Sequence, residues 1–268
     1  MSEIGKPFKS IESYNDSMRK TMKDKLFFLD FIPDQLYTFV DFGCADGSLI
    51  TTLYESCKEY DITFIGYDLS SEMINLAKKK FNYNTDRVSF TTDWDFITEK
   101  LKACVNTKKV LILSSVVHEV YSYSSKEEIE EFWERILNSG FDYICVRDMM
   151  YSQDMNRDSD SKLFFNVSTW KYKNMISEFM EKWGSLTNNL SLIHFLLKYR
   201  WQINWERELN ENYFPVEVTE FLDRFKEKYN TIYLERFRVP FLEECWKKDF
   251  DITVNDYTHI KVIFECKK

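Results

Sequence analysis

The feature that most constrains the fold is a regular alternation of apolar, strand-like runs with helical stretches between residues 36 and 148. The expected strands are 36–42, 62–67, 87–92, 110–114 and 143–147. The expected helices between them are 48–58, 71–81, 94–103 and 126–138. Alternation at this spacing predicts βαβ units and a parallel sheet with right-handed crossovers. The strands are almost continuously apolar, which is typical of strands covered on both faces, so we predict a doubly wound α/β core.

The segments around this core differ in pattern. A helical leader over 11–31, ended by Pro33, predicts an N-terminal cap within residues 1–35. After Asp148 the alternation stops, and 149–230 is predicted to be a helical, aromatic-rich insertion with helices over 171–183 and 190–205. Residues 231–268 regain strand character at 231–239 and 258–266, separated by a polar, turn-rich stretch around 247–256. We expect these last strands to close a seven-stranded sheet as an antiparallel hairpin, with the insertion lying between strands five and six.

Charge and cysteine usage exclude several classes of protein. The formal net charge is −8, which argues against a uniformly basic, nucleic-acid-binding surface. The six cysteines are scattered and form no CxxC pair, so we expect free thiols and no metal site. No apolar run approaches the roughly 18 residues of a membrane span, and the first ten residues hold no apolar signal segment. These features predict a cytoplasmic protein without a membrane segment.

The most informative motif is the stretch TFVDFGCADGSLI at 38–50, in which an apolar strand runs through a glycine-containing turn directly into a helix. Gly43 at the strand end permits a tight turn, and a helix N-terminus offers unpaired N–H groups to electronegative ligand atoms. A tight strand–helix turn without any ligand is the alternative.

Three acidic residues recur near the ends of successive strands and favour a ligand site. Asp41 precedes the turn, Asp68 follows the second strand and Asp93 follows the third. The carboxyl ends of parallel strands share one edge of the sheet, where such folds bind ligands. An acid after strand two suits two ribose hydroxyls, and one after strand three suits an adenine amino group, with Trp94 or Leu69 covering the ring.

In these motifs the chain resembles the class I S-adenosylmethionine-dependent methyltransferases, over residues 36–147 and the closing strands. The resemblance implies S-adenosyl-L-methionine as the cofactor and S-adenosyl-L-homocysteine as the product. It implies that Gly43, Cys44, Ala45 and Gly47 form the loop around the methionine moiety. Asp41 matches the acid that helps to hold the cofactor's amino group, Asp68 the ribose-binding acid and Asp93 the adenine-binding acid. Ala45 stands where a third glycine is common. These acids suit a cationic ligand better than the pyrophosphate of NAD.

The segment after strand four runs from Ser114 to Tyr123, and the resemblance places the end of that strand near the transferable methyl group. Ser114 is expected to contact the cofactor. His118 is a candidate general base and Glu119 a candidate orienting or substrate-binding residue. Packing beside the cofactor is the alternative for His118. Tyr121 is a candidate substrate contact.

The aromatic side chains of the insertion permit two interpretations. Trp201, Trp205 and Tyr213 could form a lid over the substrate, or they could build the core of the insertion. The function predicted is methyl transfer to an oxygen or nitrogen atom of a small molecule. The alternatives are methyl transfer to RNA or protein, and a protein that binds the cofactor without catalysis and acts through a partner.

Overall fold

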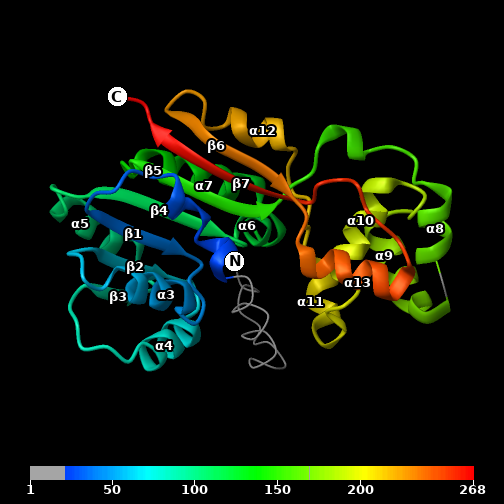
Figure 1. Cartoon of the computed structure of the whole chain (residues 1–268), viewed down its shortest axis with the longest axis horizontal. Helices are drawn as coiled ribbons and strands as arrows, with labels where there is room; N and C mark the ends of the chain where they lie inside the picture. The colour runs from blue at the N-terminus through cyan, green and yellow to red at the C-terminus, as the bar shows by residue number, and fades with distance from the viewer. Residues whose placement is uncertain (1–21, 169) are drawn as a thin grey trace. The chain divides into compact units, whose positions relative to one another are not determined.

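The structure is a computed structural model that describes residues 22–168 and 170–268. Its sheet has seven strands in the order β3-β2-β1-β4-β5-β7-β6 (Figure 1). The strands are β1 (Tyr37–Phe42), β2 (Thr63–Tyr67), β3 (Val88–Thr91), β4 (Lys108–Ser114), β5 (Tyr143–Met149), β6 (Tyr229–Phe237) and β7 (His259–Cys266). Strands β1 to β5 pair in parallel.

The last two strands are antiparallel to their neighbours. The Cys266 N–H donates to the Asp142 carbonyl, which joins the end of β7 to the start of β5. The Lys267 N–H donates to the Lys228 carbonyl, which joins the end of β7 to the start of β6. The predicted fold class, a mostly parallel seven-stranded sheet with an antiparallel closing pair, is therefore confirmed. In the described part of the chain, no helix combines the length and the apolar character that crossing a bilayer requires.

Contacts divide the chain into two compact units. The first takes the chain up to Asp148 together with Phe225–Leu234 and Lys261–Lys268. The second comprises Met149–Arg224 and Glu235–Ile260. The predicted division into a core over 36–148, an insertion over 149–230 and closing strands over 231–268 stays a prediction.

The helices of the first unit follow the predicted positions closely. They are α2 (Met22–Lys25), η1 (Phe27–Asp30), α3 (Ser48–Cys57), α4 (Ser71–Lys80), α5 (Trp94–Ala103), α6 (Val117–Tyr123) and α7 (Lys126–Asn138). The predicted capping box of Ser125 and Glu128 is formed at the start of α7. Helix α6 was not predicted. The leader helix expected over 11–31 lies largely outside the described residues.

Aromatic residues make up 17% of the chain, and many of them lie in the core of the first unit. Phe39 of β1 lies 5.9 Å, between ring centroids, from both Phe28 and Phe64. Gly66 of β2 belongs to the same packing, since a Cβ at this position would lie 2.5 Å from the ring of Phe90. The strand is thus free of a side chain where the ring packs against it.

The second unit is helical and has a core of its own. Its helices are α8 (Ser161–Val167), α9 (Lys173–Trp183), α10 (Asn189–Lys198), α11 (Trp205–Asn210), α12 (Val218–Asp223) and α13 (Pro240–Phe250), with short 3₁₀ turns η2 (Gln153–Met155), η3 (Trp170–Tyr172) and η4 (Gln202–Asn204). The helix predicted over 190–205 is wrong at its end, because α10 stops at Lys198 and η4 follows.

The turn-rich stretch predicted around 247–256 is also wrong at its start, since α13 continues to Phe250. Pro240 begins this helix, where its missing N–H costs no helical hydrogen bond. Leu242, Trp246 and Phe250 recur at helical spacing and are buried in the core of the second unit. That burial, rather than the polar residues between them, determines the local structure.

Candidate functional site

The carboxyl ends of the parallel strands are aligned in register. Phe42 at the end of β1 pairs with Tyr67 of β2, and Tyr67 pairs with Thr91 of β3. On the other side, Phe42 pairs with Leu113 of β4. The loops that follow these strands therefore begin along one edge of the sheet, as the sequence predicts for Asp41, Asp68 and Asp93.

The loop after β1 has an unusual backbone. Gly43, Ala45 and Gly47 have φ angles of 75°, 46° and 74°, all in the left-handed region. A Cβ at Gly43 would lie 2.7 Å from Val116, and one at Gly47 would lie 2.7 Å from Phe90, so both glycines are required by packing as well as by φ. At Ala45 the same conformation costs about 1–2 kcal/mol relative to the right-handed one. The loop thus adopts the glycine-type turn despite the alanine.

Asp68 ties this loop to the next one. Its Oδ2 accepts from the Ala45 N–H at 2.9 Å, and its Oδ1 accepts from the Ser70 N–H at 2.8 Å. Burial raises the pKa of Asp68, although these two hydrogen bonds oppose the rise. A carboxylate offers about four lone-pair positions, so two remain for hydroxyl donors. Asp68 is therefore equipped to organise the loop and to bind a diol.

Asp41 is the most deeply buried acid of the predicted cofactor site, with an exposed fraction of 3%. Among the described residues no group donates a hydrogen bond to its carboxylate. Burial raises the pKa of Asp41 to about 7, while the charge of Lys25 lowers it and the charge of Asp68 raises it further. A buried carboxylate of this kind suits a positively charged donor such as an ammonium group.

The third acid lies in a more open position. Asp93 is exposed, and its Oδ1 caps α5 by accepting from the Asp95 N–H at 2.9 Å. The neighbouring Trp94 packs edge-on against Phe42 and Tyr67, with centroid distances of 5.8 and 5.4 Å, and Leu69 is 43% exposed. The adenine-binding roles of Asp93, Trp94 and Leu69 stay predictions.

A buried histidine–aspartate pair joins α6, which follows β4, to the end of β5, since Asp148 is the penultimate residue of that strand. The Nδ1 of His118 lies 2.7 Å from Oδ1 of Asp148, and both residues are buried. The other oxygen of Asp148 accepts from the Val117 N–H at 2.7 Å and so caps α6. Asp148 therefore fixes both the helix that carries His118 and the orientation of the imidazole.

Asp148 is not identified from the sequence, although this acid comes directly after the predicted strand 143–147, as Asp68 and Asp93 come after theirs; the strand itself continues to Met149. The predicted fifth strand ended at Arg147, and the acid beside it was not assigned a role. The strand-end pattern that identified the other acids was the signal available for this one.

The remaining predicted residues of the first unit lie on α6 or just before it. The Ser114 hydroxyl at the end of β4 is buried and has no hydrogen-bond partner in the described part of the chain. Glu119 and Tyr121 lie half-buried on α6, and the Tyr121 hydroxyl accepts from Trp133 Nε1 at 3.0 Å. Their substrate-side roles stay predictions.

The predicted aromatic contacts of the insertion belong to the second unit. Tyr213 is buried there, its hydroxyl donates to the Glu208 carboxylate, and the ammonium of Lys198 lies 4.4 Å from its ring centroid. Trp205 donates from Nε1 to Glu178 at 2.6 Å, and Trp201 is half-buried. The placement of Tyr213 agrees with a core role, and the lid role of Trp201 and Trp205 stays a prediction.

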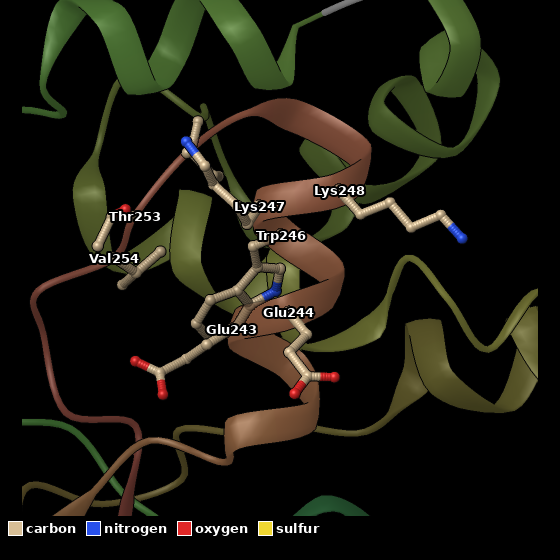
Figure 2. A pocket seen from close by; sticks show the side chains of 8 residues that line it. Glu243, Glu244, Trp246, Lys247, Lys248, Thr253 and Val254 are labelled. Carbon is tan, nitrogen blue, oxygen red and sulfur yellow. The ribbon is translucent and has the colours of Figure 1, made fainter.

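The second unit also contains a hollow of about 490 Å³ beside α13 (Figure 2). Its lining combines apolar residues around Trp246 with charged ones such as Glu243 and Lys248. The indole N–H of Trp246 already donates to the Leu196 carbonyl at 2.9 Å. None of the site residues predicted from the sequence lines this hollow.

Metal ligands do not gather in the part of the chain that the structure covers. Within residues 22–168 and 170–268, no group of three or more histidine, cysteine, aspartate or glutamate side chains is arranged to hold an ion. The thiol of Cys44, within the loop, is buried, and burial raises its pKa well above the ordinary value. A thiolate at this position is thereby disfavoured.

Comparison with known proteins identifies the fold. No family model matches the chain, and no curated protein matches its sequence. Among solved structures, a SAM-dependent methyltransferase from Anabaena variabilis ATCC 29413 matches with a TM-score of 0.50 and 12% identity, covering 100% of this chain and 99% of that one. The methyltransferase domain of bacterial CtHen1-CN matches with a TM-score of 0.48 and 10% identity, covering 93% and 98% of the two chains.

An O-methyltransferase family protein from Burkholderia thailandensis matches with a TM-score of 0.47 and 10% identity, covering 95% of this chain and 58% of that one. At these identities the likeness concerns the fold alone. The chain has the fold of the class I SAM-dependent methyltransferases, which is the fold that its sequence motifs predicted.

Proposed function

We propose that this protein is an S-adenosylmethionine-dependent methyltransferase that transfers a methyl group to an oxygen or nitrogen atom of a small molecule. The observation that carries the proposal is the sheet edge itself. It holds the buried carboxylate of Asp41, which accepts no hydrogen bond from a residue that the structure describes, the carboxylate of Asp68 with room for two hydroxyl donors, and the oriented imidazole of His118. The first two fit a ligand with an ammonium group and a ribose, and the third fits an acceptor that must lose a proton.

The chain's own residues account for the acid–base step. If the Nδ1–H of His118 donates to Asp148, the lone pair resides on Nε2, which is the tautomer needed to accept a proton from an acceptor hydroxyl or amine. When bound, the cofactor supplies an electrophilic methyl group on a sulfonium. Asp148 holds the ring in place and stabilises the imidazolium after proton transfer. The small-molecule preference rests on the acidic net charge.

The direct test is a calorimetric titration of the folded protein with S-adenosylmethionine and S-adenosylhomocysteine. We expect micromolar binding of both, followed by methyl transfer to a member of a panel of small hydroxyl- and amine-bearing acceptors. Folded protein that binds neither ligand would contradict the proposal.

Replacing Asp68 with alanine should weaken binding of S-adenosylhomocysteine by about 10- to 100-fold. The basis is the loss of charged hydrogen bonds worth roughly 1.5–3 kcal/mol. The measurement is calorimetry, with Asp61→Ala as a control at an exposed acid that precedes β2. Unchanged affinity in Asp68→Ala would remove the ribose assignment.

Replacing His118 with alanine should lower the single-turnover rate of methyl transfer by about 100-fold or more, the contribution typical of general base catalysis. Affinity for S-adenosylhomocysteine should stay within about twofold. Rapid-quench measurement at several pH values distinguishes a general base from a residue that only packs beside the cofactor. An undiminished rate would assign His118 to packing instead.

A further inference from the structure

Two buried cations of the sheet converge on one carboxylate near the carboxyl end of β5. Arg147 of β5 donates from Nε to Oδ2 of Asp24 at 2.6 Å, and Nζ of Lys261 on β7 lies 2.6 Å from Oδ1 of the same residue. The side chains of Arg147 and Lys261 are only 6% and 11% exposed, whereas that of Asp24 is 33% exposed. Burial raises the pKa of Asp24, but the two cations outweigh burial and hold it below its ordinary value. The sheet thus contains a carboxylate-binding pair of cations, and a side chain of the four-residue helix α2 occupies it.

A hydroxyl beside this pair lacks a hydrogen bond. Ser114 at the end of β4 is the register partner of Arg147, and partners on neighbouring parallel strands project from the same face of the sheet. Its Oγ is buried and, among residues 22–168 and 170–268, has no hydrogen-bond partner. The large majority of buried side-chain polar atoms are hydrogen-bonded, so this atom indicates a partner that the described residues do not supply. A carboxylate held by Arg147 can accept from this hydroxyl.

The cations also lie at the edge of the sheet that carries the candidate base. Arg147 immediately precedes Asp148, whose carboxylate lies 2.7 Å from Nδ1 of His118. Successive side chains of a strand point to opposite faces, so Arg147 and Asp148 flank the end of β5 from its two sides. A small molecule that crosses the end of this strand can therefore reach both the guanidinium and the imidazole.

We propose that the methyl acceptor carries a carboxylate, which Arg147, Lys261 and Ser114 bind in place of the Asp24 side chain. This inference rests on the proposed function and names the class of its acceptor, a small hydroxy acid or amino acid. Asp24 is then an internal competitor that keeps the two cations paired until an acceptor arrives. Arginine suits this exchange, because its planar guanidinium binds a carboxylate through two parallel hydrogen bonds. An uncharged acceptor cannot replace Asp24, so the site discriminates against it.

The test measures the binding of benzoate and benzamide, which have nearly the same shape and differ in charge. Asp24→Asn removes the internal carboxylate with little change in side-chain volume. Calorimetry should show benzoate binding to Asp24→Asn at least about 10-fold more tightly than to the unaltered protein, with no such gain for benzamide. Adding Lys261→Met to Asp24→Asn should abolish the gain. Asp142→Asn, which removes the charge paired with Lys108 at 2.6 Å, is the matched control and should not improve benzoate binding.

A second variant keeps the inference testable if Asp24→Asn does not fold. Ser114→Ala leaves the ion pairs of Asp24 in place and removes one hydrogen bond to a charged group. It should weaken the binding of benzoate by about 10-fold relative to the unaltered protein and should leave the binding of benzamide unchanged. Thermal unfolding checks that each variant is folded.

The possible outcomes separate this inference from the function on which it rests. Equal affinity of Asp24→Asn and the unaltered protein for benzoate would overturn the carboxylate site, and so would an equal gain for benzamide. Methyl transfer to a hydroxy acid that is no faster than transfer to its amide would overturn the assignment of the site to the acceptor. Failure of the unaltered protein to bind S-adenosylhomocysteine would instead overturn the proposed function, and the benzoate result would stand apart from it.

Discussion

Replacing Asp148 with alanine is expected to lower the free energy of unfolding by about 2–5 kcal/mol, because two buried groups lose their acceptor at a cost of roughly 1–3 kcal/mol each. Asp148 is 1% exposed and accepts from the Val117 N–H at 2.7 Å while lying 2.7 Å from the His118 ring nitrogen. Alanine leaves both groups without these acceptors in the interior. It also removes the cap of α6, which has no side-chain cap of its own.

Urea unfolding followed by circular dichroism measures this loss. Asp148→Asn should cost less, because its amide oxygen can still accept one of the two hydrogen bonds. Asp154→Ala, at an exposed position, is the control and should change stability by less than about 0.5 kcal/mol. If Asp148→Ala unfolds at the same urea concentration as the unaltered protein, the pair does not contribute to stability in the manner that its geometry indicates.

Replacing Asp41 with asparagine is expected to stabilise the protein at pH 8 and, at the same time, to weaken ligand binding. Burial raises the pKa of Asp41 from 3.8 to about 7, so the folded protein binds this proton more tightly than the unfolded chain does. The contribution of Asp41 to the free energy of unfolding is fully present below about pH 4 and is lost as the pH rises through about 7. Asparagine carries no charge and avoids that loss. After allowance for the cost of burying an amide, we expect the free energy of unfolding of Asp41→Asn to be about 2–4 kcal/mol higher than that of the unaltered protein at pH 8, and little changed at pH 4.

The effect on binding has the opposite sign. Without the negative charge, affinity for S-adenosylhomocysteine should fall by about 100-fold at pH 8. In the unaltered protein the same affinity should weaken as the pH falls below 7, because Asp41 becomes protonated, and Asp41→Asn should lack this dependence. Unfolding and calorimetric titrations between pH 5.5 and 8.5 measure both effects, with Asp86→Asn as an exposed control. Tight binding by Asp41→Asn at pH 8 would contradict the assignment of Asp41 to an ammonium group.

The parallel core was predictable because its signals are local. Each strand is a continuous apolar run, and each helix begins and ends near residues that favour those positions, as with Ser125 and Glu128 of α7. The placement of Asp41 and Asp68 along one edge of the sheet was predictable, since the carboxyl ends of parallel strands must share an edge. The hydrogen bond from the Ala45 N–H to Asp68 was not predictable, because it depends on how two loops pack.

Helix α6 shows why other parts could not be predicted. Its N-cap residue, Val116, has no oxygen in its side chain, and the cap comes from Asp148, 31 residues away from Val117. A local pattern cannot indicate a helix that depends on such a distant group. Helix α13 differs, because its signals are local: Pro240 and the helical spacing of its apolar residues are visible in the sequence. The polar residues around 247–256 instead led to the prediction of a turn-rich stretch.

The order of strands has a consequence for synthesis on the ribosome. β7 lies between β5 and β6 although it is translated after both of them. Until residues 259–266 have emerged, each of those strands lacks the neighbour that will later satisfy its backbone groups, and such an edge readily pairs with other chains. All residues of the second unit, in contrast, have been translated by Ile260. All residues of the second unit are therefore synthesised before the last residues of β7, which complete the sheet.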